Sequence, residues 1–302
     1  MSRRDTGLAL VTVFIWGVNF VAIDYGLRSF PPLLFAALRF LLVALPAMFF
    51  VSRPRVAWRW LCAIGLLTGV GQFGLLFTGM HLGVPAGLAA LVLQSQALFT
   101  LVFSVAVLRE KPRRAQVAGI VLASLGIAVI GWSLASSVRV GAFLLVVAAG
   151  ACWAGANIAT RFARPDSGFG LVVWSSLLSP LPLALLSMLL EGPGRDRRAL
   201  TGFTAQAGLS LLFVVLASTL LAFGLWNHLL ARHPAHVVAP YSLLVPVVGF
   251  VTSWLLLGEA PTYAEVGGGV TILMGLLAVT VRRADVPAAV SASVPADERI
   301  RM

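Results

Sequence analysis

The chain has 302 residues, of which 59% are hydrophobic and 11% are charged, and its mean hydropathy is +0.96. Soluble domains carry about 25% charged residues, so this composition excludes an ordinary soluble domain and is typical of a protein surrounded by lipid. The formal net charge of +11 would suit a nucleic-acid-binding protein. However, the arginines form short clusters between apolar runs and no basic domain, so we expect no nucleic-acid partner.

Ten apolar stretches are long enough to cross a bilayer, which takes about 20 residues. In chain order they are 7–26, 31–51, 58–79, 85–107, 114–133, 140–161, 168–190, 208–230, 235–257 and 263–281. They lack the alternation of barrel strands, so we expect helices. No small-residue cleavage site follows the first stretch, which predicts a retained helix and not a signal peptide. The predicted fold class is an all-α polytopic membrane protein with ten transmembrane helices.

The positive charges predict the orientation of these helices. Most arginines and lysines fall in loops on one side, for example in 53–59 and 109–114. The 191–207 loop is the exception, because it places Arg195, Arg197 and Arg198 on the other side. Positively charged loops stay in the cytoplasm, so we expect an inner-membrane protein with both termini cytoplasmic.

The second half of the chain repeats the first at a constant offset. The matching residues are Pro85-Ala86 with Pro234-Ala235, Leu108, Glu110 and Pro112 with Leu257, Glu259 and Pro261, and Gly119 and Gly126 with Gly268 and Gly275. Each half then holds five helices, and an odd number inverts the second half in the membrane. We therefore expect two inverted five-helix repeats, 1–135 and 136–283, followed by a flexible cytoplasmic tail, 284–302.

The predicted spans contain no group of residues of the kind that catalyses a reaction inside a membrane. Every Asp and Glu falls in a loop, a tail or a helix end, so no carboxylate pair is placed to hold Mg²⁺ or to exchange protons. His233 and His236 form a loop pair without a third zinc ligand. We expect no catalytic residue, no metal and no cofactor.

Uncharged hydrogen-bonding and aromatic side chains occupy the middle of several spans instead. We expect them to line a cavity that holds a small zwitterion, with these substrate-binding residues: Trp16, Asn19, Gln72, Gln94, Gln96, Trp153, Asn157, Trp226 and Tyr241. An amide inside a bundle can equally bridge two helices, and both interpretations stay open. In an unbroken helix Gln94 and Gln96 would lie about 200° apart, so they would not face the same cavity.

Arg39 is the one ion well inside a predicted span. An intramembrane charge is either functional or clamped by acceptors inside the bundle. We favour a structural or gating role for Arg39, and likewise for the repeated pair Glu110 and Glu259. His228 is a titratable group close to the predicted cavity, and proton coupling through it or through a helix-end acid stays open beside facilitated export.

The sequence resembles the EamA family of the drug/metabolite transporter superfamily along nearly its whole length. The motifs that carry the resemblance are Trp16-Gly17-Val18-Asn19-Phe20, Leu38-Arg39-Phe40, Pro85-Ala86-Gly87-Leu88-Ala89, Leu91-Val92-Leu93-Gln94-Ser95-Gln96 and Leu243-Leu244-Val245-Pro246-Val247-Val248-Gly249. It looks most like the O-acetylserine/cysteine exporters, which have segments similar to Met1-Ser2-Arg3-Arg4-Asp5 and Pro31-Pro32-Leu33-Leu34. It departs from them at Asp24, where such members often carry Lys.

The resemblance implies a central cavity lined by helices 1, 3, 4, 6, 8 and 9. It also implies export of amino acids such as cysteine or O-acetylserine. We therefore expect a secondary exporter that works by alternating access, with a small-molecule substrate and the lipid bilayer as partners and a homodimer left open. The alternatives are a same-fold exporter of a purine, a sugar derivative or a drug, a membrane-embedded enzyme, and a structural subunit.

Overall fold

The computed structural model describes residues 1–133, 140–233 and 235–280. Throughout these ranges the regular elements are helices, which confirms the predicted all-α class. The predicted tail, 284–302, lies outside the described residues, as do the boundary between the predicted repeats at 135–136 and Pro234 of the repeated Pro-Ala pair.

Eight helical segments are long and apolar enough to cross a membrane: Arg3–Leu27, Trp58–His81, Ala86–Leu108, Arg114–Ser133, Val140–Ala163, Gly168–Leu190, Ala205–Arg232 and Pro240–Leu257. Two shorter apolar helices, Pro32–Ala47 and Tyr263–Ala278, fall on the two remaining predicted stretches. Each predicted stretch therefore contains an apolar helix, and the chain is a multi-pass membrane protein.

Several spans are made of more than one helical element. In chain order the elements are α1 (Arg3–Leu27), α2 (Pro32–Ala47), α3 (Trp58–Gly65), η1 (Leu66–Gly74), α4 (Leu75–His81), α5 (Ala86–Val92), α6 (Ser95–Leu108), α7 (Arg114–Ser133), α8 (Val140–Ala163), α9 (Gly168–Ser176), α10 (Pro180–Leu190), α11 (Pro193–Gly202), α12 (Ala205–Leu212), η2 (Phe213–Leu221), α13 (Ala222–Arg232), α14 (Ala235–Val238), η3 (Ala239–Leu244), α15 (Val245–Leu257) and α16 (Tyr263–Thr280).

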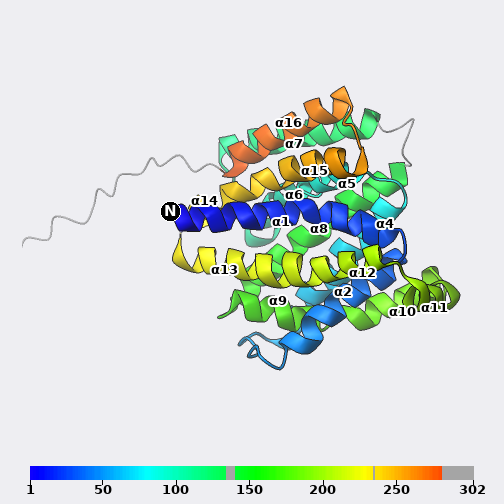
Figure 1. The fold of residues 1–302 in the computed structure, drawn as a ribbon. Helices are drawn as coiled ribbons and strands as arrows, with labels where there is room; N and C mark the ends of the chain where they lie inside the picture. Colours follow the sequence, from blue (N-terminus) through cyan, green and yellow to red (C-terminus); the bar gives the residue numbers. More distant parts are fainter. Residues whose placement is uncertain (134–139, 234, 281–302) are drawn as a thin grey trace, which may run out of the picture.

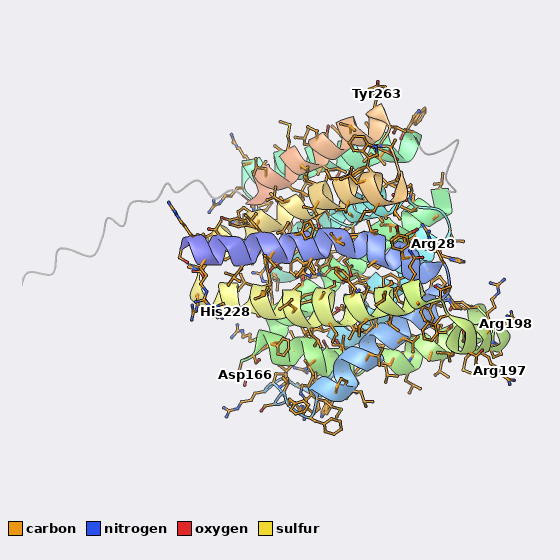
Figure 2. The ribbon with its side chains drawn as sticks, viewed as in Figure 1. Arg28, Asp166, Arg197, Arg198, His228 and Tyr263 are labelled. Atoms are coloured by element: carbon orange, nitrogen blue, oxygen red, sulfur yellow. The ribbon has the colours of Figure 1, made fainter. Side chains whose placement is uncertain are left out.

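The spans lie side by side in one bundle and alternate in direction (Figure 1). The end where α1 begins is called the N-terminal end below. The other end, which carries α11, is called the opposite end. His228 and Asp166 lie at the N-terminal end, whereas Arg28, Arg197 and Arg198 lie at the opposite end (Figure 2).

Side chains cap several helix starts, because the first backbone N–H groups of a helix have no partner within it. The Ser2 hydroxyl accepts a hydrogen bond from the Asp5 amide at 3.1 Å, and the Thr204 hydroxyl accepts one from Ala207 at 3.2 Å. A remote carboxylate caps α2 in the same way. Glu191 accepts from the Leu33 amide at 2.9 Å and so ties the end of α10 to the start of α2.

The irregular elements occur at matching places in the two halves. The third span contains the π-helical segment η1 and the eighth contains η2, and both have nine residues. The fourth span is interrupted between α5 and α6, and the ninth contains the 3₁₀ segment η3 before α15. π-helical turns are rare and are frequently found at functional sites.

The helix contacts show the same pairing. Helix α1 packs on α15 as α8 packs on α6, and α1 packs on α12, η2 and α13 as α8 packs on α3, η1 and α4. Three further contacts join counterpart spans directly: the second and seventh through α2 and α10, the fourth and ninth through α5 and α15, and the fifth and tenth through α7 and α16.

The repeated glycines form the contact between α7 and α16. A Cβ on Gly126 would lie 2.6 Å from the Gly268 carbonyl oxygen, and a Cβ on Gly275 would lie 2.5 Å from the Gly119 carbonyl oxygen. The helix backbones approach this closely only because all these positions lack a side chain, as is common at helix contacts in membranes.

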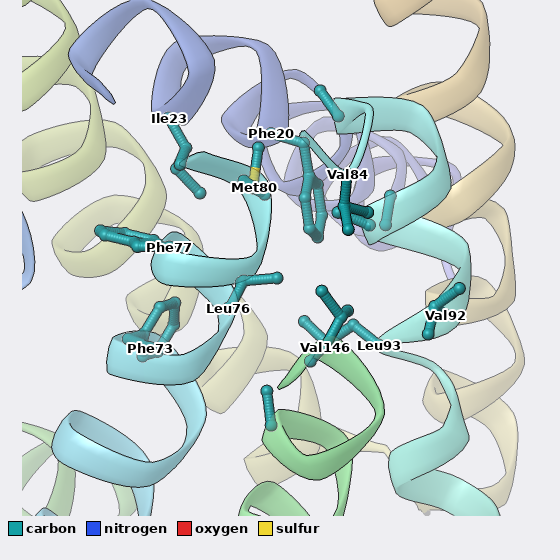
Figure 3. Packing of buried hydrophobic residues seen from close by; sticks show 14 of the residues in the cluster. Phe20, Ile23, Phe73, Leu76, Phe77, Met80, Val84, Val92, Leu93 and Val146 are labelled. Atoms are coloured by element: carbon teal, nitrogen blue, oxygen red, sulfur yellow. The ribbon is translucent and has the colours of Figure 1, made fainter. Parts of the chain in front are cut away.

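Part of the hydrophobic core packs between the spans in the half of the bundle nearer the opposite end, and Figure 3 shows this packing from close by. This part contains Phe20 and Ile23 of α1, Phe77 of α4, Leu91 of α5 and Val146 of α8, all buried. Ile23, Phe77 and Val146 are fully excluded from solvent. These side chains pack together between the first, third, fourth and sixth spans.

Candidate functional site

A cavity of about 380 Å³ lies inside the bundle on the N-terminal side of this core. Its lining comes from the first four spans and the sixth to the ninth. On α1, which starts at the N-terminal end, the lining residues Trp16 and Asn19 fall mid-helix. On α8, which ends there, they run from Trp153 to Thr160 in its second half. The cavity therefore occupies the middle of the bundle and its N-terminal half.

The structure brings together all but one of the predicted binding residues. Those that line the cavity are Trp16, Asn19, Gln72, Gln94, Gln96, Trp153, Asn157 and Trp226. Tyr241 is not among the lining residues and packs against the hydrophobic cores instead. Arg39, predicted to have a structural or gating role, also lines the cavity.

The expectation that Gln94 and Gln96 cannot face one cavity was wrong. It assumed an unbroken helix, whereas α5 ends at Val92 and α6 begins at Ser95. Around the break the hydrogen bonds tighten to a three-residue spacing, as in Gln94 N–H to the Leu91 carbonyl at 3.1 Å and Gln96 N–H to the Leu93 carbonyl at 3.1 Å. The changed rotation turns both amides toward the same space.

One wall of the cavity is a polar cluster between α6 and α8. The Asn157 amide donates to the Gln96 side-chain oxygen at 3.0 Å and to the Thr100 hydroxyl at 3.2 Å. Asn157 thus bridges two helices and lines the cavity at once, so the two interpretations of a buried amide both apply to this residue.

Another wall is aromatic. The Trp16 ring centre lies 5.1 Å from that of Phe223 and 5.2 Å from that of Trp226. The Trp16 indole N–H donates to the Ser218 carbonyl at 3.1 Å, which fixes the ring plane and joins α1 to η2. The cavity therefore presents apolar faces next to amides, which suits a small molecule with a polar head and a short apolar part.

Arg39 is the single charged side chain among the described residues that line the cavity. It is 2% exposed, and its Nη2 donates to the Thr219 hydroxyl at 3.0 Å. Its guanidinium carbon lies 3.9 Å from the centre of the Phe73 ring, at cation–π distance.

Sequence reasoning missed several lining hydroxyls, among them Ser175, Ser218 and Thr219. Serine and threonine often bond their own helix backbone, as Thr219 does to the Val214 carbonyl at 2.8 Å, so their presence alone predicts little. The one available signal was position, since Ser218 and Thr219 both lie about two turns before the predicted residue Trp226.

The two repeated glutamates lie at different ends and make different contacts. At the opposite end Glu259 accepts from the Ala86 amide at 3.2 Å and from the Gly87 amide at 3.4 Å, and it contacts the Ser253 hydroxyl. At the N-terminal end Glu110 forms an ion pair with Arg161, which also donates to the Ser104 hydroxyl at 3.1 Å.

His228 is exposed and is not a lining residue, so the structure does not place this titratable group in the cavity. His233 instead forms a 3.0 Å contact with Asp5 and joins α13 to α1 at the N-terminal end. Among the described residues, the structure holds no group of three His, Cys, Asp or Glu placed to bind a metal.

A second, larger hollow of about 960 Å³ lies at the opposite end. Its lining includes the charged residues Arg28, Glu191, Arg195 and Arg198, together with residues inside the third span such as Val70 and Gly74. None of the predicted binding residues lines it. The cavity beside Arg39 is therefore the candidate binding site.

The EamA-like transporter family matches residues 6–132 and 140–281. The chain belongs to this family. It is therefore a transporter of the drug/metabolite transporter superfamily, as its motifs had indicated.

Two curated relatives carry the same description, "Probable amino-acid metabolite efflux pump". The one from Salmonella typhimurium is 45% identical over 282 residues, which cover 91% of this chain and 94% of the relative. The one from Escherichia coli is 40% identical over 282 residues, with the same coverage of both chains. A solved crystal structure that is 22% identical covers 93% of this chain and 97% of its own, with a TM-score of 0.61, and shows a shared fold.

Proposed function

We propose that this chain exports small amino-acid metabolites, such as cysteine or O-acetylserine, across the inner membrane. The observation that carries the proposal is the cavity itself. Amides and aromatic rings surround about 380 Å³ in the middle of a multi-pass bundle. The descriptions of the two relatives favour amino-acid metabolites as the cargo over a purine, a sugar derivative or a drug.

We infer that the ten spans form two inverted five-helix repeats, 1–135 and 136–283. The family match in two stretches, one for each half, supports this division. The paired contacts of α1 with α15 and of α8 with α6 support it as well. So do the close approaches of Gly126 to Gly268 and of Gly119 to Gly275, because an inverted pair relates each contact to the other.

Alternating access follows from this symmetry. In the described state the cavity lies in the middle and the N-terminal half, and the buried side chains of Ile23, Phe77 and Val146 pack on its other side. Exchanging the roles of the two repeats would open the opposite end and close the N-terminal one. We therefore infer a transport cycle between these two arrangements.

We infer that the repeated glutamates take part in the change between these two arrangements. Glu259 and Ser253 join the end of α15 to the start of α5, next to the hydrophobic core. Their repeat counterparts, Glu110 and Ser104, contact Arg161 at the other end. We infer that Glu259 and Ser253 stabilise the closed form of the opposite end and are released when that end opens.

We propose that the N-terminal end is cytoplasmic. The clusters 53–59 and 109–114 lie in loops between spans that meet at this end, as the positive-inside rule requires. Arg197 and Arg198 lie at the opposite end (Figure 2), but they belong to α11 in the longest inter-span segment of that end. The described cavity then lies in the middle and the cytoplasmic half of the bundle.

Efflux from living cells tests the proposed function. Cells that lack and cells that express the chain are loaded with a labelled panel of amino acids, purines and sugar derivatives, and release is timed. The proposal predicts faster release of cysteine or O-acetylserine from the expressing cells alone. A Trp16→Ala variant, matched for membrane level, serves as the control for a damaged cavity. Faster release of purines or sugars only would contradict the proposed cargo.

A further inference from the structure

Arg39 is a buried cation whose hydrogen-bonding capacity is mostly unused. It is 2% exposed and donates one described hydrogen bond, from Nη2 to the Thr219 hydroxyl at 3.0 Å. Its Nε and Nη1 are buried and have no hydrogen-bond partner among the described residues. Together these two nitrogens carry three N–H donors.

A structural clamp would not leave these donors empty. A buried charge without partners is costly, and buried cations are normally paired with a carboxylate or with several acceptors. The Phe73 ring, 3.9 Å from the guanidinium carbon, covers one face of the Arg39 group. It cannot replace acceptors in the guanidinium plane, where the N–H groups point.

Two unpaired hydrogen-bond acceptors belong to residues that line the same cavity. The side-chain oxygens of Asn19 and Gln72 are buried and have no hydrogen-bond partner among the described residues. Asn19 is 6% exposed and Gln72 is 3% exposed. The residues that line the cavity therefore carry unpaired donors on a cation and unpaired neutral acceptors. A ligand with a carboxylate and an ammonium group would satisfy both sets.

We propose that Arg39 binds the carboxylate of the cargo and that the Asn19 and Gln72 oxygens accept hydrogen bonds from its ammonium group. The assignment deepens the proposed function and rests on it for the direction of transport, but not for binding. It makes Arg39 a specificity-determining residue for carboxylates, in place of the structural or gating role that the sequence favoured.

The geometry also explains how the site keeps its cargo mobile. Arg39 is the one charged side chain among the described lining residues. The ammonium group of the cargo would therefore contact only neutral acceptors there. A single charge-assisted contact gives selectivity, while a matching carboxylate in the wall would bind the zwitterion at both ends and slow its release.

The test uses the purified full chain in lipid nanodiscs and measures thermal stability with four probes. L-Serine carries both groups, L-serinamide lacks the carboxylate, lactate lacks the ammonium group, and lactamide lacks both. A ligand that binds the folded state raises the melting temperature in proportion to its occupancy. We expect serine to stabilise most, lactate less, and the two amides little.

Variants separate a binding role from a structural one. Losing a charge-assisted hydrogen bond costs a factor of about 10 to 100 in affinity, so Arg39→Gln should remove the preference for serine over serinamide. Arg39→Lys keeps the charge but not the planar group and should keep part of the preference. The exposed substitution His228→Gln is the matched control.

The outcomes discriminate between the two proposals. Equal stabilisation by serine and serinamide in the wild-type chain would overturn the role of Arg39, and so would the absence of any effect of serine and lactate. Both of these comparisons use the wild-type chain, so they remain decisive even if the Arg39→Gln protein does not fold. Stabilisation by lactate and serine with no amino-acid efflux from cells would sustain the carboxylate site and reject the proposed export.

Discussion

The carboxylate of Glu259 accepts a hydrogen bond from the backbone amide of Ala86 at 3.2 Å, across the boundary between the two halves of the chain. This contact places a negative charge at the start of α5, where the unpaired N–H groups and the helix dipole favour one. It also holds the ninth span against the fourth beside the hydrophobic core.

Glu259→Gln should therefore loosen the opposite end. The amide keeps the shape but loses the charge, which is worth about 0.3–1 kcal/mol at a helix start. We expect a cysteine introduced at Met80, in a background without Cys62 and Cys152, to react faster with a membrane-impermeant thiol reagent added outside. Glu110→Gln is the control, because it changes the N-terminal end only. A faster reaction in both variants would contradict the assignment of one glutamate to each end.

Gly126→Leu should lower the yield of folded protein strongly. A side chain at this position would overlap the Gly268 carbonyl oxygen and force α7 away from α16. Gly267→Leu is the matched control, since nothing lies within 4 Å of a Cβ at Gly267. The yield is measured by fluorescence-detected size exclusion in detergent. Equal yields for the two variants would show that the glycine contact does not hold the helices together.

Asn157→Leu should reduce transport more than it reduces stability. The variant loses two hydrogen bonds, to Gln96 and Thr100, and interhelical bonds in membranes average about 0.6 kcal/mol each. It also converts a polar patch of the cavity wall into an apolar one. We expect a melting temperature within a few degrees of wild type, with cargo uptake at least several-fold slower. A large loss of stability with normal uptake would make Asn157 a bridge only.

His228→Gln should leave transport unchanged at every pH tested. The imidazole is exposed and does not line the cavity, so its protonation has no direct route to the cargo. The measurement is uptake into proteoliposomes with and without an imposed pH gradient. If the gradient drives uphill transport in the wild type and fails in His228→Gln, proton coupling runs through this residue after all.

Reporter fusions test the orientation. Fusions after Arg55, Arg114 and Arg164 should report the cytoplasm, and a fusion at Gly83 should report the outside. The reason is the excess of arginine and lysine at the N-terminal end. An outside signal at Arg114 would contradict both the orientation and the ten-span arrangement.

The sequence predicted the bundle well because its signals were long and redundant. Each apolar stretch needs about 20 residues, so the positions of the spans were predicted to within a few residues at their ends, although the breaks inside the fourth and ninth spans were not. The repeat was predicted from Gly119, Gly126, Gly268 and Gly275, and these residues turn out to touch one another. A glycine that recurs at a fixed offset marks a close approach that only glycine permits, which is a physical reason for the match.

The site was predicted less completely. Gln94 and Gln96 were placed on opposite faces because the sequence between α5 and α6 contains no proline or glycine that would have predicted a break in the helix. Arg39 was assigned a clamp because the sequence does not show which acceptors surround it. Only the three-dimensional arrangement reveals that its Nε and Nη1 have no described hydrogen-bond partner. It also reveals that the side-chain oxygens of Asn19 and Gln72, two residues that line the same cavity, are unpaired as well.

The most direct test of the central claim is counterflow with the purified chain in proteoliposomes. Vesicles are preloaded with unlabelled cysteine or O-acetylserine, diluted into a trace of the labelled compound, and sampled over time. The account predicts transient accumulation of label that saturates with concentration and is absent from empty vesicles. Accumulation of a labelled purine or sugar derivative, with none of either amino acid, would contradict it.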